Sequence, residues 1–126
     1  MNLHEIRRSP EFQKLWFRVA FLDEWDDVED YYRKYGPEIN LEVYAEHRSI
    51  WQQYDGIGFL LKKKVIDLSF IDDALKGSVM MMWIKFEPLI IDARKSSGIS
   101  NLYGDFEFLY NKLRHAGIKT PASPNF

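Results

Sequence analysis

Cysteine is absent from the sequence, and glycine and proline are scarce, with 7 and 5 among 126 residues. The absence of cysteine excludes disulfides, cysteine-ligated zinc, iron–sulfur clusters and thiol nucleophiles. The low glycine and proline content, together with 46% hydrophobic residues, excludes disordered, collagen-like and low-complexity chains. A chain of this length can bury a core as one domain. We therefore predict a single helical domain over residues 1–117 and a frayed tail over residues 118–126.

The sequence also lacks a strong charge of one sign and a long hydrophobic run. Its 17 basic and 19 acidic side chains leave a formal net charge of −2, whereas nucleic acid binding by bulk electrostatics needs a dense basic surface. The longest apolar stretches, residues 15–22 and 79–93, contain charged residues and fall short of the roughly 18 apolar residues that a membrane span needs. We therefore expect a cytoplasmic protein with no signal peptide and no membrane span.

Hydrophobic residues recur at helical spacing, and signals for strands are almost absent. Ser9 and Pro10 predict the start of a first helix, which continues to about residue 22. Six acids within residues 23–30 and the stop at Gly36 predict a short second helix. These acids indicate a solvated helix start, because they lack the spacing of an EF-hand loop.

From Asn40, apolar positions spaced by three and four residues predict a long third helix of about 22 residues that ends in the lysines 62–64. Gly56 and Gly58 lie inside it, and each lowers helix stability by about 1 kcal/mol relative to alanine. Their expected benefit is the close approach of a neighbouring helix. Residues 65–75 are expected to form a helical connector.

Residues 79–84 are apolar around the whole helix circumference, which indicates a helix that is buried on all sides. We predict a central apolar helix near 79–94, kinked at Pro88 and preceded by a break at Gly77 and Ser78. A final helix, capped by Asn101 or Asp105, ends near residue 116. The predicted fold class is all-α, with about five helices in a compact irregular bundle.

Known catalytic and metal-binding patterns are missing. The histidines His4, His47 and His115 have no paired spacing, which is typical of ordinary surface or boundary histidines. The pair Gly56 and Gly58 lacks a third glycine and a preceding strand, and no GxSxG nucleophile elbow occurs. We therefore expect no enzyme activity, no cofactor and no metal.

Two weaker patterns point to binding functions. Residues 65–83 have the rhythm of a helix-turn-helix, but the second helix is apolar, whereas a helix that reads DNA presents polar side chains. The first helix carries more aromatic residues than one buried face needs, which favours self-association through a candidate interface formed by Phe12, Trp16, Phe17 and Phe21.

Asp55 lies within the apolar stripe of the third helix, where an unpaired charge would be costly to bury. We predict a buried ion pair between Asp55 and either Arg48 or Arg94. Such a pair could also be mistaken for catalytic residues. A single-site enzyme that uses Asp55, Arg48 or Arg94 is the third interpretation of the sequence, after the two binding functions.

The chain resembles a widespread family of small all-helical bacterial and archaeal domains of unknown function. The resemblance rests on residues 9–12, 25–27, 35–37 and 106–109, and on isolated positions such as Trp83 and Arg94. Its stronger block is Tyr54-Asp55-Gly56-Ile57-Gly58-Phe59-Leu60-Leu61-Lys62-Lys63, which leads to residues 65–67. It implies a fold and no chemistry. It also implies that some members carry an N-terminal membrane helix, which this sequence is expected to lack.

The preferred interpretation is a non-enzymatic protein-interaction or regulatory module that forms a homodimer or binds a protein partner. The alternative is a nucleic-acid-binding regulator of the helix-turn-helix type. An exposed aromatic patch favours the first interpretation, and a basic polar surface favours the second.

Overall fold

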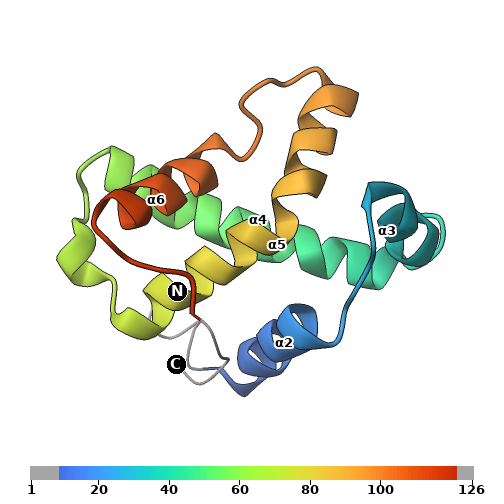
Figure 1. Ribbon diagram of the computed structural model, residues 1–126, viewed down its shortest axis with the longest axis horizontal. Helices are drawn as coiled ribbons and strands as arrows, with labels where there is room; N and C mark the ends of the chain where they lie inside the picture. The colour runs from blue at the N-terminus through green and yellow to red at the C-terminus, as the bar shows by residue number, and fades with distance from the viewer. Residues whose placement is uncertain (1–8, 122–126) are drawn as a thin grey trace. The chain divides into compact units, whose positions relative to one another are not determined.

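The computed structural model describes residues 9–121, which form five α-helices, one 3-10 turn and no strand (Figure 1). This confirms the predicted all-α class. In chain order the elements are α2 (Pro10–Phe21), α3 (Val28–Tyr35), α4 (Leu41–Lys62), η1 (Leu68–Phe70), α5 (Asp73–Ser97) and α6 (Gly104–His115).

The helices α2 and α4 begin where the sequence predicts, and α3 begins at Val28 within the acidic run of residues 23–30. The hydroxyl of Ser9 accepts a hydrogen bond from the backbone N–H of Phe12 at 3.0 Å, and Pro10 occupies the first turn of α2. Asp27 caps α3 in the same way, and the side chain of Asn40 accepts from the N–H of Val43 at 3.2 Å at the start of α4. These local caps satisfy amide groups that have no partner inside the helix.

Contacts divide the chain into two compact units, with the boundary between residues 50 and 51 inside α4. The described part of unit 1 comprises residues 9–50, and that of unit 2 comprises residues 51–121. The single domain over residues 1–117 stays a prediction. Residues 118–121 follow α6 outside any helix, and the rest of the predicted tail lies outside the described residues, as does His4.

The core of unit 2 is built on α5, which packs against α6. Met82, Trp83 and Phe86 of α5 are buried, and the Trp83 ring packs edge-to-face on Phe106 of α6. Figure 1 shows that α5 bends along its length, and Pro88 lies within this helix. A proline inside a helix removes one backbone hydrogen bond and clashes with the preceding turn, as the predicted kink requires.

The predicted break at Gly77 and Ser78 is wrong, because both residues are buried inside α5. The helix begins at Asp73, where the side chain of Asp72 accepts from the N–H of Leu75. The helix-turn-helix interpretation depended on this break. Its recognition helix is also unsuited to reading DNA, because the side chains of residues 79, 80, 82 and 83 are buried.

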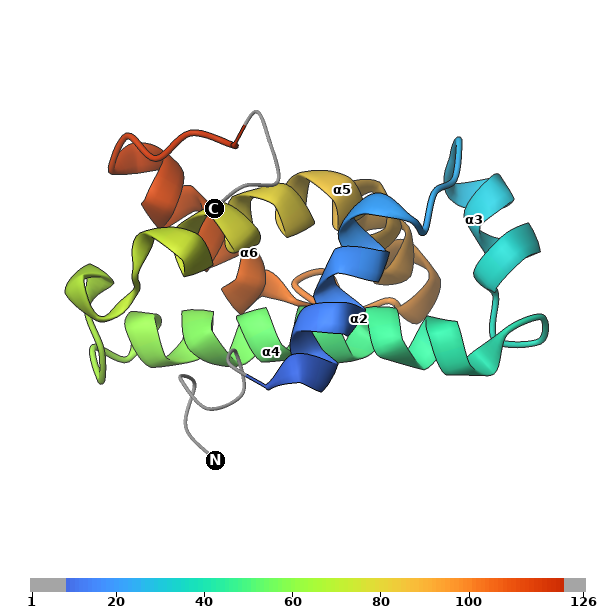
Figure 2. The ribbon, with the colours of Figure 1, turned by 90° about the horizontal axis from the view of Figure 1, so that it is seen from below.

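The predicted helical connector is helical only in part: it contains the 3-10 turn η1 over residues 68–70, and its last residues, 73–75, belong to α5. Asp67 caps this turn by accepting from the N–H of Ser69 at 2.8 Å. In both ribbon views the connector projects at one end of unit 2, and it is drawn in yellow-green (Figure 2).

Candidate functional site

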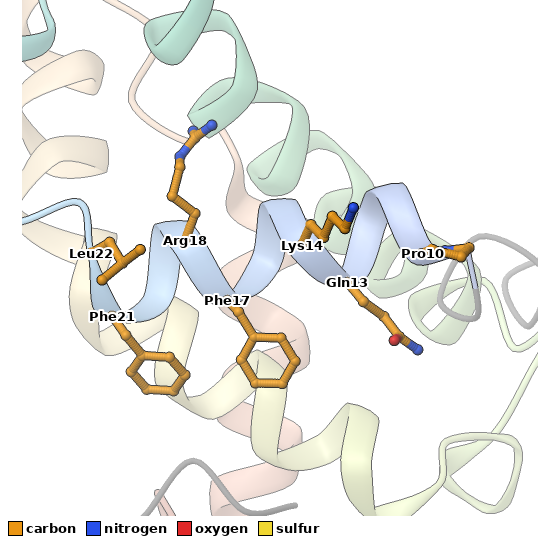
Figure 3. A pocket seen from close by; sticks show the side chains of 7 residues that line it. All are labelled: Pro10, Gln13, Lys14, Phe17, Arg18, Phe21 and Leu22. Carbon is orange, nitrogen blue, oxygen red and sulfur yellow. The ribbon is translucent and has the colours of Figure 1, made fainter.

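The helix α2 has apolar side chains on opposite sides. Val19 is fully buried, whereas the ring of Phe17, two residues earlier, is 48% exposed. Phe17 stacks on Phe21 one turn later, with 5.9 Å between the ring centroids. Figure 3 shows both rings projecting from the same side of the helix. This outward side borders an open pocket of about 570 Å³ lined by Pro10, Gln13, Lys14, Phe17, Arg18, Phe21 and Leu22.

The structure separates the four residues of the candidate interface. Phe17 and Phe21 line the outward pocket, and Leu22, which is 74% exposed, extends it. Trp16 is buried, with its ring edge-to-face to both phenylalanines, and Phe12 is half-buried. Of the four residues, therefore, only Phe17 and Phe21 present their rings to this pocket. We call the surface formed by Pro10, Phe17, Phe21 and Leu22 the α2 face.

A chain of buried hydrogen bonds joins the helices of unit 1. The hydroxyl of Tyr31 in α3 lies 2.7 Å from Nδ1 of His47 in α4, and Nε2 of His47 lies 2.8 Å from Oδ2 of Asp23, just beyond α2. An ionised carboxylate only accepts hydrogen bonds. Nε2 therefore donates to Asp23, and in the neutral ring Nδ1 accepts from Tyr31.

Charged and aromatic side chains surround the hydrogen-bonded series Asp23, His47 and Tyr31. Nε of Arg18 lies 3.3 Å from Oδ2 of Asp23, and Nη2 of Arg18 lies 3.0 Å from Oε1 of Glu46. The rings of Trp25 and Tyr35 pack against the imidazole of His47. His47 is fully buried, which corrects its prediction as a surface or boundary histidine, whereas His115 is exposed as expected.

The order carboxylate, imidazole and hydroxyl resembles a catalytic triad, but the hydroxyl has the wrong properties for a nucleophile. Tyr31 is buried, and this burial raises the pKa of its phenol well above the usual range. A reactive hydroxyl needs access to a substrate and a proton that leaves easily. The arrangement is suited to fixing the positions of α2, α3 and α4 residues within unit 1.

In unit 2, Asp55 does not form the predicted ion pair. Its carboxylate accepts from the N–H of Phe106 at 2.9 Å and makes no ion pair with any residue in the described range. Arg94 instead donates to Glu107 at 2.8 Å and to the carbonyl of Leu102 at 2.9 Å. Arg48, in unit 1, donates to the hydroxyl of Tyr44 at 2.7 Å.

The contact made by Asp55 has a local cause at the start of α6. The residue before this helix is Tyr103, which has a φ of 58° and supplies no side-chain cap, contrary to the predicted caps at Asn101 or Asp105. Asp55 supplies the missing acceptor from α4. Burial, with a smaller contribution from the neighbouring charge of Asp105, raises the pKa of Asp55.

Asp55 also borders a polar pocket of about 340 Å³ that includes Lys62, Arg94, Asp105 and Glu107. Lys62 lies 3.5 Å from Asp105, so the basic groups in this pocket already have acidic partners. Among residues 9–121, no three potential ligand side chains come together where they could hold a metal ion. Over the same range, no helix combines the length and the apolar character needed to cross a membrane.

The sequence of these helices matches a known family over residues 4–113, which is most of the chain. The chain belongs to the domain of unknown function DUF4760. This confirms the resemblance to a family of small helical domains. Comparison with curated proteins and with solved structures gives no match.

The hydrogen bonds from Asp23 through His47 to Tyr31 were not predicted from the sequence, although one feature of the sequence pointed to them. His47 falls on the apolar stripe of a long helix, and a polar side chain in such a position needs a buried partner. The partners are 16 and 24 residues away in sequence, so helical spacing does not reveal them.

Proposed function

We propose that this domain is a non-enzymatic cytoplasmic interaction module that binds a second copy of itself through the α2 face. The observation that carries the proposal is the stacking of Phe17, which is 48% exposed, on the half-buried Phe21, on a helix whose opposite side is already buried. The apolar ring surface that this pair leaves in contact with water gains free energy when an interface covers it.

Symmetry supports a second copy as the occupant. A twofold axis across the α2 face aligns the two helices in opposite directions and places the Phe17 and Phe21 rings of one copy against those of the other. The same patch is then complementary to itself in hydrophobicity. Arg18 does not contribute to this contact, because it already lies 3.3 Å from Asp23 and 3.0 Å from Glu46.

The α2 face is one side of a short helix, whereas a standard interface buries about 800 Å² on each partner. We therefore expect weak dimerisation, with a dissociation constant in the micromolar range or above. This corresponds to a binding free energy of roughly −8 kcal/mol or less favourable. The fraction of protein in the dimer then changes with the protein concentration, because the dimer forms and dissociates at concentrations near its dissociation constant.

The test is analytical ultracentrifugation of the wild-type chain and of Phe17→Glu over a range of concentrations. The wild type should show a monomer–dimer equilibrium, and Phe17→Glu should remain a 15.0 kDa monomer because it places a charge in the interface. Ile99→Glu is the matched control, since Ile99 is exposed to a similar extent in unit 2. A wild type that stays monomeric at high micromolar concentration contradicts the proposal.

A further inference from the structure

The projecting end of unit 2 combines lysines with exposed apolar side chains. Three consecutive lysines, residues 62–64, end α4 and begin the connector. Val65 and Phe70 follow within the connector and are 65% and 69% exposed. Phe59, in the last turns of α4, is also exposed, and the ammonium of Lys63 lies 5.7 Å from the centre of its ring.

Of these residues, Lys62, Lys64, Val65 and Phe70 border an open depression of about 750 Å³. Its walls include Val65 and Phe70 from the connector and Phe108 from α6. The ammonium groups of Lys62 and Lys112 lie 5.9 and 5.6 Å from the centre of the Phe108 ring. Apolar surface and positive charge therefore alternate over a single patch.

The backbone explains why the apolar tips point outward at this end. Lys64 adopts a left-handed conformation, with φ at 62°, and the N–H of Val65 donates to the carbonyl of Leu60 at 3.0 Å. The chain reverses immediately after α4, and the connector is then closed by η1. Both ribbon views show this segment at the extremity of unit 2 (Figures 1 and 2).

We propose that this patch, which we call the lysine patch (Phe59, Lys62, Lys63, Lys64, Val65, Phe70 and Lys112), binds the surface of an anionic lipid bilayer. Lysines near such a surface gain from its negative potential, and apolar tips gain by entering the boundary between headgroups and acyl chains. The protein has a net charge of −2, so attraction to an anionic surface has to come from a local group of lysines.

The local charge balance supports this assignment. The depression is lined by three lysines and one acid, Asp67. The carboxylate of Asp67 is occupied by both the N–H and the hydroxyl of Ser69. Asp105 lies close to Lys62 on its other side, at 3.5 Å, but does not line the depression. Lys64 and Lys112 make no ion pair with any described residue and can both face an anionic surface.

An acidic protein segment has the same charge as a bilayer, but the shape of the patch favours the bilayer. Its most exposed apolar side chains, Val65 and Phe70, lie on the connector at the end of unit 2, and the depression that they line is open rather than enclosed around a peptide. A bilayer accepts projecting side chains because they enter it from outside.

The test is co-sedimentation of the full chain with vesicles of phosphatidylcholine that contain roughly one third phosphatidylserine. Wild-type protein should bind these vesicles, bind pure phosphatidylcholine vesicles at least about tenfold less, and be released by high salt. Lys64→Glu should lower binding about tenfold, because it removes one attraction and adds one repulsion. Phe70→Ser should lower binding by a similar factor through lost insertion.

Two matched variants control for general effects. Lys95→Glu changes the net charge as Lys64→Glu does, at an exposed site at the end of α5, and Ile99→Ser removes an exposed apolar side chain of unit 2. Both should bind within about twofold of wild type. Phe17→Glu should also bind normally, which separates this test from that of the α2 face.

Three results would overturn the proposal. The first is wild-type binding that is absent or equal on the two kinds of vesicle. The second is normal binding of Lys64→Glu, which would place the contact elsewhere. The third is binding to soluble poly-glutamate without binding to vesicles, which would assign the lysine patch to an acidic protein partner.

Discussion

The hydroxyl of Tyr31 lies 2.7 Å from Nδ1 of His47, and both side chains are buried. Because Nε2 of the same ring contacts Asp23 at 2.8 Å, both imidazole nitrogens have partners inside unit 1. A buried polar ring that satisfies both of its nitrogens is compatible with an apolar core, whereas one left with an unpaired nitrogen is not.

Tyr31→Phe should therefore destabilise the protein. The substitution keeps the aromatic ring but leaves Nδ1 of His47 buried without its donor, and this should cost about 1–3 kcal/mol in the free energy of unfolding. Urea denaturation followed by tryptophan fluorescence measures the change. Tyr110→Phe is the control, because Tyr110 is only half-buried, and its effect should stay within about 0.5 kcal/mol. Equal midpoints for the two variants would show that the contact contributes no stability.

Asp30 should make the stability of the protein depend on pH. The N–H of Asp26 donates to its carboxylate at 2.9 Å, and Arg33 and Lys34 approach it to 2.7 and 3.0 Å, so its pKa is lowered to about 2. Since the pKa is lower in the folded than in the unfolded chain, the stabilisation is complete above about pH 4 and is lost as the pH falls toward 2.

Thermal unfolding of Asp30→Asn across this pH range tests the effect. The variant should melt below wild type at pH 7, and the gap should close between pH 4 and pH 2 as the wild-type carboxylate becomes protonated. Glu29→Gln is a suitable neighbour control because its side chain is exposed. A gap that is constant with pH would mean that the charge of Asp30 is not responsible.

The stability of the protein should change differently when Asp55 loses only its charge and when it also loses its hydrogen-bond acceptor. Asp55→Asn keeps an acceptor for the N–H of Phe106, and Asp55→Ala removes it. Burial raises the pKa of Asp55, so ionisation of this group opposes folding as the pH rises above its ordinary value. At pH 7, Asp55→Asn should therefore be at least as stable as wild type, whereas Asp55→Ala should lose about 1 kcal/mol through the missing cap. A loss of stability in Asp55→Asn comparable to that in Asp55→Ala would indicate that the charge itself is needed.

The features that could be predicted from the sequence are those set by neighbouring residues. Ser9 and Asn40 cap helices that begin one residue later, and helical spacing places the apolar side of α4. The contact from Asp55 to Phe106 spans 51 residues, and it exists because Tyr103 offers no local cap. Such contacts depend on which helices pack together, and helical periodicity does not contain that information.

The same distinction explains the error at Gly77 and Ser78. Both residue types favour turns when exposed, but here the hydroxyl of Ser78 is hydrogen-bonded to the buried hydroxyl of Tyr54 in α4. Packing within unit 2 thus holds these residues in a helix that local preference would interrupt.

The two glycines of α4 provide the sharpest test of the helix packing. A methyl group added at Gly58 would lie 1.8 Å from the carbonyl oxygen of Asp105 and 3.3 Å from Cβ of Leu109. These atoms belong to α6, and one is backbone, so the helix itself would have to move. Gly56 is exposed and has no atom within 4 Å of the same position, apart from its own helix and chain neighbours.

Alanine should therefore have opposite effects at the two sites. Gly58→Ala should lower the free energy of unfolding by at least about 2 kcal/mol, because displacing α6 disrupts the packing of Phe106 and Leu109. Gly56→Ala should raise it by about 0.5–1 kcal/mol, because alanine is the better helix former and the site has room. Urea denaturation of both variants gives the comparison. If Gly58→Ala were as stable as Gly56→Ala, α6 would not approach α4 as closely as the structure shows, and the cap that Asp55 provides for α6 would be in doubt as well.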